Sequence, residues 1–467
     1  MNIQHLTLTE AKQLIQNREI TPLELTQAVI ERIERHDPVL NCYLSVFREE
    51  ALSKAERLSK AFKHPRPLSP LYGIPIGIKD IISIRGHPLR AGSKVWEGYT
   101  PDQDARVVER VRQSGAILIG YHNMHEIALG VTNLNPHFGA VRNPWRTDRI
   151  SGGSSGGSAA AVVAGLCLGA IGTDTGGSIR IPASLCGAVG LKPTFGRVSL
   201  RGVLPLSWNL DHVGPLGRCV EDVALLYRLI AGNDPQDATN AQKPLRNPLP
   251  HLKEGVKGLR IALAEDEFFT QAEEEVLRAV RLAADVLREL GAVVEPICVP
   301  EGALAAQTNA LMVISDAAAI YEKQLSERPQ QFGEDVLQRL RNGAAVAVTQ
   351  YVQARRTQAI LQKRYRELFK RYNLLLTPTT PIAAPAIVGQ DSLEAAKVLT
   401  RFTSPFNLTG LPALSLPCGF NAEGLPIGLQ IVADHWQEEL LLRAGYAYEQ
   451  ATQSRRQFAW SETFLNI

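Results

Sequence analysis

The residues that decide the fold are Arg149 to Thr194, which read RISGGSSGGSAAAVVAGLCLGAIGTDTGGSIRIPASLCGAVGLKPT. Two glycine clusters that carry serine, Gly152–Ser158 and Gly176–Ser178, stand on either side of an apolar run. Glycine loses more conformational freedom on folding than any other residue, so clusters this dense indicate backbone conformations or close approaches that a β-carbon would prevent. The stretch therefore predicts two tight loops built to hold a polar group.

The same stretch predicts the elements that carry these loops. Ser158 to Gly165 is alanine-rich and is expected to form a closely packed helix, and Leu168 to Ile171 a buried strand. The loop 172–177 then brings Ser178 to the start of a helix that runs to Cys186. Free backbone N–H groups of a loop and of a helix N-terminus stabilise a nearby negative charge. We therefore expect Ser178 to lie where an oxyanion would be stabilised.

Outward from this stretch, the chain alternates helical and strand-like segments. Leu71 to Ile82 is an apolar run that contains one lysine, Lys79, which is either an edge residue reaching water or a buried amine. Arg106 to Ile119 reads as a helix followed by a strand, and Asn123 to Gly130 as the start of another helix. Gly258 to Val299 has the strand, helix, strand order of a βαβ-like unit.

Composition places the chain among ordinary globular enzymes. Of its 467 residues 45% are hydrophobic and 21% charged, with a formal net charge of +3. No basic tail or stripe indicates a nucleic-acid site; one predicted helix is rich in arginine and lysine and is expected to be a solvated face. The N-terminus lacks a signal pattern and no apolar run approaches the length of a membrane span. We predict a cytoplasmic protein with no membrane partner.

The six cysteines have neither CxxC nor metal-ligand spacing. They predict reduced, mostly buried thiols and no zinc site. Other readings of the glycine clusters fit poorly: a P-loop needs lysine and Ser/Thr after its last glycine, and GxGxxG is absent. Gly152 to Gly156 matches the GxSxG nucleophile elbow, but RNPWRTDRI before it is too polar and proline-broken for the required strand. From the residues alone, the alternative interpretation that the glycines only permit tight packing around two loops remains open.

At this point the sequence resembles the amidase signature family, whose two glycine–serine clusters fall on residues 152 to 194. The similarity runs from about residue 5 to 450 and includes GIPIGIKD, AGSK, RNPW, LKPTFGRVS, LLLTPTTP, NLTGLPALSLPCGF and LPIGLQIV. In that family a lysine, a serine preceded by a cis peptide and a nucleophilic serine form a catalytic triad. The resemblance places them on Lys79, Ser154 and Ser178.

The resemblance also implies the architecture: one large α/β domain with a mixed twisted β-sheet covered by helices on both faces. Within residues 1–467 we expect an N-terminal helical arm (1–64), a catalytic core (65–231), a surface linker (232–257) and a C-terminal part that completes the sheet and pocket (258–467).

The chemistry of the residues agrees with this assignment. A serine hydroxyl is a weak nucleophile until a base takes its proton, and no histidine lies in the clusters. Burial beside Ile78 and Ile81 would lower the pKa of Lys79 toward neutrality, and Ser154 would relay the proton from Ser178. No metal or organic cofactor is then required.

The oxyanion hole would be made by backbone N–H groups of the nucleophile loop, namely Thr175, Gly176, Gly177 and Ser178. Supporting roles are weaker predictions. Asp174 and Arg180 would orient the loop or form a structural ion pair, and Ser155 is expected to bond backbone. His125 and Met124 could border the cavity, with His125 expected to be a surface residue.

Two functions remain open from the sequence. The first is a free-standing amidase that forms an acyl-Ser178 intermediate on a small-molecule amide. The second is similar to the glutaminase subunit of a tRNA-dependent amidotransferase, which acts with partner subunits. The resemblance implies that such a glutaminase holds glutamine with an arginine and an aspartate; an ungapped placement puts Gln358 and Thr400 there. The absence of both charges favours the free-standing hydrolase. The identity of the amide substrate and the oligomeric state, for which a homodimer is one possibility, stay open.

Overall fold

The computed structural model describes residues 5–61 and 68–452, and its centre is one mixed sheet of 11 strands. The strand order is β1-β3-β2-β6-β8-β7-β12-β13-β11-β9-β10. In that order the strands are Tyr43–Val46, Ile117–His122, Pro75–Lys79, Gly169–Asp174, His212–Gly217, Val189–Lys192, Ala413–Phe420, Pro426–Ala433, Leu374–Pro378, Arg260–Ala264 and Val293–Ile297. Leu134–Asn135 (β4) and Gly139–Ala140 (β5) form a separate small hairpin.

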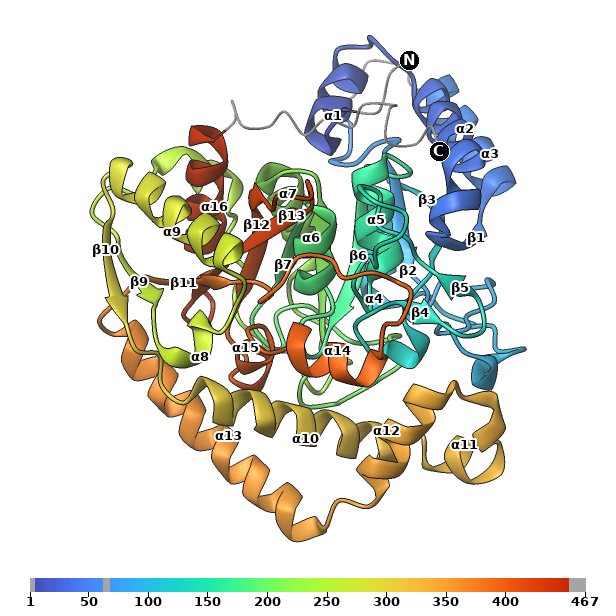
Figure 1. Cartoon of the computed structure of the whole chain (residues 1–467). Helices are drawn as coiled ribbons and strands as arrows, with labels where there is room; N and C mark the ends of the chain where they lie inside the picture. Colours follow the sequence, from blue (N-terminus) through green and yellow to red (C-terminus); the bar gives the residue numbers. More distant parts are fainter. Residues whose placement is uncertain (1–4, 62–67, 453–467) are drawn as a thin grey trace.

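Helices lie in most of the connections between these strands (Figure 1). They are α1 (Leu8–Gln16), α2 (Pro22–Leu40), α3 (Arg48–Ala61), α4 (Arg106–Gln113), α5 (Gly156–Ala164), α6 (Arg180–Cys186), α7 (Val220–Ile230), α8 (Glu267–Thr270), α9 (Glu274–Glu289), α10 (Gly302–Ile320), α11 (Glu322–Glu327), α12 (Glu334–Ala344), α13 (Val348–Phe369), α14 (Ser392–Leu399), α15 (Ser404–Leu408) and α16 (Glu438–Ala451).

The sheet is covered on both faces, as β13 illustrates. A β-carbon on Gly428 would lie 2.4 Å from Ser184 Oγ of α6, so this face of the strand meets α6. The neighbouring Ile427 packs with Val276 and Ala279 of α9. Successive residues of a strand point to opposite faces, so α6 and α9 lie on opposite sides of the sheet. The predicted α/β domain with a mixed, doubly covered sheet is confirmed.

Two parallel pairings position the site. β2 pairs in parallel with β3 on one side and with β6 on the other, with Ile78 opposite Ile171. All five residues of β2 and all six of β6 are buried, as expected for parallel strands covered on both faces. The carboxyl ends of β2 and β6 therefore lie side by side, and ligands of open α/β sheets bind at such ends.

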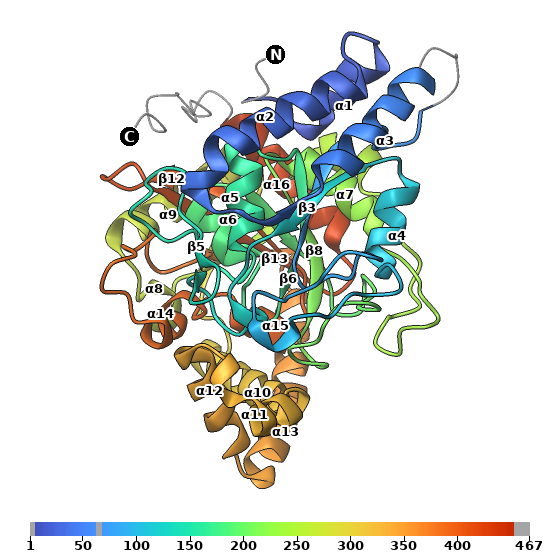
Figure 2. The same cartoon turned by 90° about the vertical axis from the view of Figure 1, so that its right-hand side faces the viewer.

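Four helices, α10–α13 (Gly302–Phe369), project from the body beyond α14 and α15 (Figure 2) and are here named the helical lobe. By length and apolar composition α10 could cross a membrane. The core helices of globular proteins can have the same length and composition. In α10 the Asp316 carboxylate accepts a hydrogen bond from the Ser207 hydroxyl of the body. The lobe is thus joined to the body by polar contacts.

Several predicted elements are displaced or replaced. The helix expected to start at Ser178 begins at Arg180, and the helix expected between Asn123 and Gly130 is instead one 3₁₀ turn, Glu126–Ala128. The reason is backbone geometry, because Ile127 has φ 44° and cannot continue a right-handed helix. The expected boundary at residues 64 and 65 lies outside the described residues.

The N-terminal arm and the linker carry more structure than predicted. The arm contains two capping boxes, Thr7 with Glu10 and Thr21 with Glu24, and also supplies the edge strand β1. In the linker Asp234 is 3% exposed, accepts from Ser199 Oγ at 2.7 Å and pairs with Arg201. The linker is therefore fixed to the catalytic core by buried polar contacts.

Candidate active site

Lys79 is the last residue of β2 and its side chain is fully buried. Its Nζ lies 2.7 Å from Ser154 Oγ and 2.8 Å from Thr173 Oγ1 of β6. Burial lowers the pKa of Lys79 to about 7, although the carboxylates of Asp174 and Asp211 act in the opposite direction. Of the two readings of Lys79, the structure selects the buried amine with partners, and those partners are hydroxyls that can exchange protons.

Ser154 lies in the loop between Ile150 and α5, and the peptide bond Gly153–Ser154 is cis. The Ser154 carbonyl oxygen accepts the His125 backbone N–H at 3.2 Å. The next residue connects the two glycine clusters, because the Ser155 N–H donates to the Ser178 carbonyl oxygen at 3.1 Å. The main chains of the predicted shuttle and nucleophile are thus adjacent in space.

Ser155 forms hydrogen bonds with the backbone, as the sequence predicts. Its hydroxyl donates to the Thr173 carbonyl oxygen at 3.1 Å and accepts the Thr173 N–H at 3.3 Å. Thr173 in turn presents its own hydroxyl to Lys79. Ser155 therefore ties the first glycine cluster to the end of β6, beside the lysine.

The turn that carries Ser178 is held by one carboxylate. Asp174, the last residue of β6, accepts the N–H groups of Gly177 at 2.8 Å and Ile179 at 3.1 Å. Gly177 has φ 134°, and a β-carbon there would lie 2.3 Å from Thr403 Oγ1, so both backbone and space require glycine. The turn is therefore held by contacts within the chain.

Arg180 completes this clamp from the first residue of α6. Its guanidinium donates to Asp174 through Nε at 3.0 Å and Nη2 at 2.9 Å, and to Gln430 Oε1 at 2.6 Å. Burial raises the pKa of the Asp174 carboxyl, but the Arg180 charge beside it prevails and holds that pKa well below its ordinary value. The sequence left orientation and an ion pair as alternatives, and the structure contains both.

One of the four predicted oxyanion donors already has a partner within the chain. The Gly177 N–H already donates to Asp174 Oδ1 at 2.8 Å, so it cannot serve an oxyanion without breaking the clamp. The prediction treated every backbone N–H near the helix start as free to bind an oxyanion. In the structure α6 begins only at Arg180, and the Asp174 carboxylate already accepts some of these N–H groups. Thr175, Gly176 and Ser178 remain as predicted donors.

His125 is placed differently from the prediction, and its neighbour Met124 is also buried. Both side chains are 0% exposed, so His125 is a buried histidine and not a surface one. Its Nε2 lies 3.1 Å from Asp335 Oδ2 of α12, which is 210 residues further along the chain. A sequence pattern that reads local periodicity cannot detect a partner at this separation.

Sequence reasoning missed three further residues around the nucleophile loop. Asp211 accepts the Thr175 hydroxyl at 2.6 Å, and burial raises the pKa of Asp211 to about 6. Asn407 donates to Asp174 Oδ1 at 2.8 Å, and Asn309 of α10 donates to the Thr175 carbonyl at 3.4 Å. Asn407 is the first residue of the NLTGLPALSLPCGF motif, which was the one available signal; Asp211 and Asn309 lie in no quoted motif, and none of the three is close in sequence to the loop it contacts.

The two positions compared with glutamine-binding charges are neutral. Gln358 of α13 is buried and donates to the Leu408 carbonyl at 2.9 Å, while the exposed Arg355 donates to its Oε1 at 2.8 Å. The Thr400 methyl lies 4.0 Å from the place a β-carbon on Gly176 would take, so Thr400 borders the nucleophile loop. Gln358 is thus engaged with backbone and Thr400 offers no charge.

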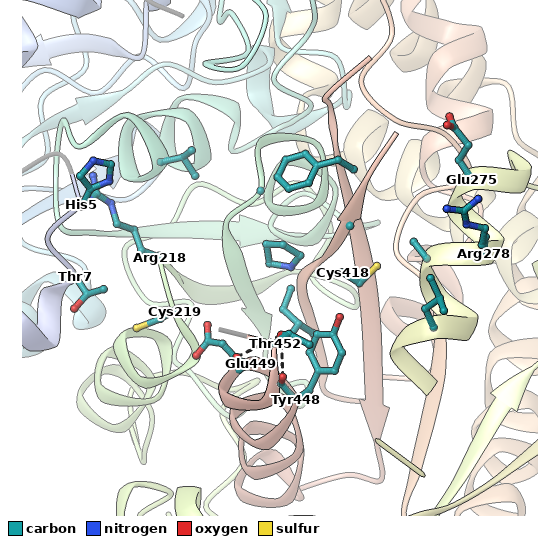
Figure 3. Close-up of a pocket in the computed structure, with 18 residues that line it drawn as sticks. His5, Thr7, Arg218, Cys219, Glu275, Arg278, Cys418, Tyr448, Glu449 and Thr452 are labelled. Atoms are coloured by element: carbon teal, nitrogen blue, oxygen red, sulfur yellow. Dashed lines mark hydrogen bonds between the residues drawn. The ribbon is translucent and has the colours of Figure 1, made fainter. Parts of the chain in front are cut away.

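A cavity of about 430 Å³ lies elsewhere, between α9, β12, α16 and the start of α1 (Figure 3). In Figure 3 His5 and Arg218 line one wall, and Glu275 and Arg278 lie opposite. The lining includes none of Lys79, Ser154 and Ser178. Within residues 5–61 and 68–452 no group of three or more His, Cys, Asp or Glu side chains could hold a metal ion.

Comparison with known proteins agrees on one family. Residues 24–442 match the family model described as Amidase. The A subunit of the glutamyl-tRNA(Gln) amidotransferase from Roseiflexus sp. (strain RS-1) is 39% identical over 474 residues, covering 96% of this chain and 97% of that protein.

Two solved structures show the same fold along nearly the whole chain. One comes from work on an unexpected vestigial protein complex and the evolutionary origins of an s-triazine catabolic enzyme; it has a TM-score of 0.91, 33% identity, and coverage of 97% of this chain and 99% of that one. The peptide amidase from Stenotrophomonas maltophilia has a TM-score of 0.84, 30% identity, and coverage of 96% and 97%.

Proposed function

The chain belongs to the amidase family, the amidase signature enzymes, and on this premise we propose that it hydrolyses a carboxylic amide through an acyl-Ser178 intermediate. The observation that carries the proposal is the 2.7 Å contact between Lys79 Nζ and Ser154 Oγ, made by a fully buried lysine. The Ser155 N–H bond to the Ser178 carbonyl brings the predicted nucleophile beside this pair.

In the proposed reaction neutral Lys79 accepts the Ser154 proton while Ser154 accepts the proton of Ser178. The Ser178 oxygen then forms a bond to the amide carbonyl carbon, and the carbonyl oxygen gains a negative charge. N–H groups of Thr175, Gly176 and Ser178 would stabilise that charge; losing one such donor typically costs about 10²–10³ in rate.

The second half of the reaction reverses the proton movements. The protonated lysine returns a proton through Ser154 to the leaving nitrogen, the carbon–nitrogen bond breaks, and ammonia or an amine departs. Water, deprotonated through the same relay, attacks the ester and releases the acid and Ser178. The chain itself supplies base, relay, nucleophile and oxyanion donors, so this scheme uses no cofactor.

Of the two family activities we favour a free-standing hydrolase of linear, small-molecule amides. The neutral Gln358 and Thr400 support this choice, because an α-amino acid such as glutamine carries two charges that need partners. We place the enzyme in the cytoplasm, with no direct nucleic-acid or membrane partner; α10 belongs to the helical lobe, and the six cysteines are free.

A second candidate is the ammonia-supplying glutaminase subunit of a tRNA-dependent amidotransferase. The 39% identity to the A subunit of a glutamyl-tRNA(Gln) amidotransferase, over nearly the full length of both proteins, favours it. Under this reading the chain needs partner subunits, whereas a free-standing enzyme acts alone or as a homodimer.

The deciding experiment measures ammonia release by the purified single chain from acetamide, propionamide and glutamine, and acid release from benzamide and an anilide. Ser178→Ala serves as the blank. Turnover of simple amides with little on glutamine supports the free-standing enzyme. Activity confined to glutamine, or appearing only after a partner subunit is added, supports the second candidate.

A further inference from the structure

The segment 123–133 is a buried loop whose shape its surroundings must enforce. Ile127, Ala128 and Asn133 all have left-handed backbone, with φ 44°, 61° and 57°. Such conformations are rare for residues other than glycine, and most of all for a β-branched one. Strained loops of this kind persist only where contacts over-determine them, and they cluster at functional sites.

This loop contacts the serine relay directly. The His125 N–H donates to the Ser154 carbonyl oxygen at 3.2 Å, and Asn133 Oδ1 accepts the Gly156 N–H at 3.2 Å. Between these contacts, a β-carbon on Gly153 would approach Asn133 N to 3.2 Å. The backbone on both sides of Ser154 is therefore seated against segment 123–133.

The His125 ring faces the other way, toward the helical lobe. Its Nδ1 accepts the Asn133 N–H at 3.2 Å, and a backbone N–H can only donate, so the neutral ring carries its proton on Nε2. Nε2 lies 3.1 Å from Asp335 Oδ2 and donates to it. A β-carbon on Gly130 would lie 2.0 Å from Nε2, so this seat exists only because residue 130 is glycine.

The neighbouring Glu126 strengthens the same junction. Its carboxylate accepts the Gly333 N–H at 2.7 Å, at the N-cap of α12, and also the Ser93 hydroxyl at 2.5 Å. A carboxylate at a helix N-terminus is favourably placed. Two consecutive residues, 125 and 126, thus hold the first turn of α12.

We propose that His125 is a positioning residue that transmits the docking of the helical lobe to the Ser154 relay: its ring holds Asp335 of α12 while its main chain holds the Ser154 carbonyl. The inference rests on the proposed function, because it concerns the geometry of the proton relay. It makes the lobe a part of the catalytic apparatus, although the lobe supplies no member of the predicted triad.

The test compares Asp335→Ala with Glu334→Ala. Both residues are acidic and lie in the first turn of α12, but Glu334 is exposed, so the pair matches charge and helix position. We expect Asp335→Ala to lower kcat about tenfold while KM changes little, and Glu334→Ala to leave both unchanged. Asp335→Asn, which keeps an acceptor for Nε2–H, should recover most of the rate.

A merely structural role is separated by labelling Ser178 with phenylmethylsulfonyl fluoride. Positioning predicts slower labelling of Asp335→Ala with the same final stoichiometry, whereas misfolding lowers the stoichiometry itself. His125→Ala should show the same slowing. Equal kcat for the two alanine variants, or a loss of rate that follows the loss of labelled sites, would overturn this inference alone. Turnover by Ser178→Ala would overturn the proposed function and the inference with it.

Discussion

Two buried lysines at strand ends, Lys79 of β2 and Lys192 of β7, show what separates a candidate base from a structural donor. Both side chains are 0% exposed, and burial lowers the pKa of each. Lys79 faces the hydroxyls of Ser154 and Thr173. Lys192 faces the carbonyl oxygens of Leu411 at 2.5 Å and Pro193 at 3.1 Å.

The third neighbour of Lys192 completes the contrast. His212 Nδ1 lies 2.6 Å from the Leu210 carbonyl, so that nitrogen carries the proton and Nε2, 3.3 Å from Lys192 Nζ, accepts. Lys192 is thus surrounded by acceptors and can only donate, whereas a hydroxyl can give its proton to Lys79. The comparison teaches that a buried lysine with a lowered pKa can act as a general base only where its partners can release a proton.

The largest expected effect concerns the first lysine. Lys79→Met should reduce kcat about 10⁴-fold with the fold retained, because the relay loses its terminal base. Steady-state turnover beside Ser178→Ala and a thermal melt measure this. Near-normal turnover at neutral pH would mean that burial and hydroxyl partners do not identify the base.

Ser154→Ala is expected to cost about 10²–10³ in kcat, because Lys79 then has no hydroxyl through which to reach Ser178. A matched Ser151→Ala control alters a nearby buried serine whose hydroxyl donates to the Gly152 carbonyl oxygen at 2.9 Å. Steady-state turnover of both variants on one amide measures the difference. If the two variants turned over equally well, Ser154 would not be the relay.

Lys192→Met tests the other side of the comparison. The change leaves two carbonyls and a histidine nitrogen without a donor, at about 1–3 kcal/mol for each group. We expect a free energy of unfolding lower by several kcal/mol, read from denaturant titration, with kcat per folded molecule within about tenfold. A variant of normal stability that had lost turnover would assign Lys192 to the chemistry instead.

The pH dependence should report Lys79. Protonated lysine cannot accept the Ser154 proton, so kcat/KM is expected to rise with pH up to about 7 and to level off above it. Because the folded pKa lies below the ordinary lysine pKa of 10.5, the unfolded state binds more protons between about 7 and 10.5, and this group's contribution to stability rises across that window. A flat rate profile between pH 5 and 8 would contradict the assignment.

The smallest effect is expected at Thr173→Val, which keeps the shape but removes one hydroxyl from Lys79. A single hydrogen bond contributes about 0.5–1.5 kcal/mol, so kcat/KM should fall by several-fold at most. The loss should be largest above about pH 7, where Lys79 starts as the neutral amine and becomes the ammonium that needs this acceptor during the reaction; below that pH the lysine is protonated before the reaction begins and the loss should be smaller. A fall as deep as that of Ser154→Ala would make Thr173 an alternative relay.

The glycine and serine clusters of 152–178 were sufficient to predict two tight loops and the buried strand between them, whereas the chemistry assigned to Ser154 and Ser178 stays a prediction. They were not sufficient to predict the donors that remain free, because the Gly177 N–H is taken by Asp174, a bond that depends on the turn's dihedral angles. Nor could local periodicity show that segment 123–130 is not a regular helix and that its His125 and Glu126 side chains contact the start of α12.

From the sequence alone, the resemblance to the amidase signature family predicted the covered α/β sheet and the candidate triad, because the motifs that carry this resemblance lie along short stretches. Only the tertiary structure decided which buried lysine faces hydroxyls and which faces carbonyls, where the nucleophile loop finds Asp211 and Asn309, and how the helical lobe reaches the relay. Those contacts join residues that the chain separates widely, and the strand order places them together.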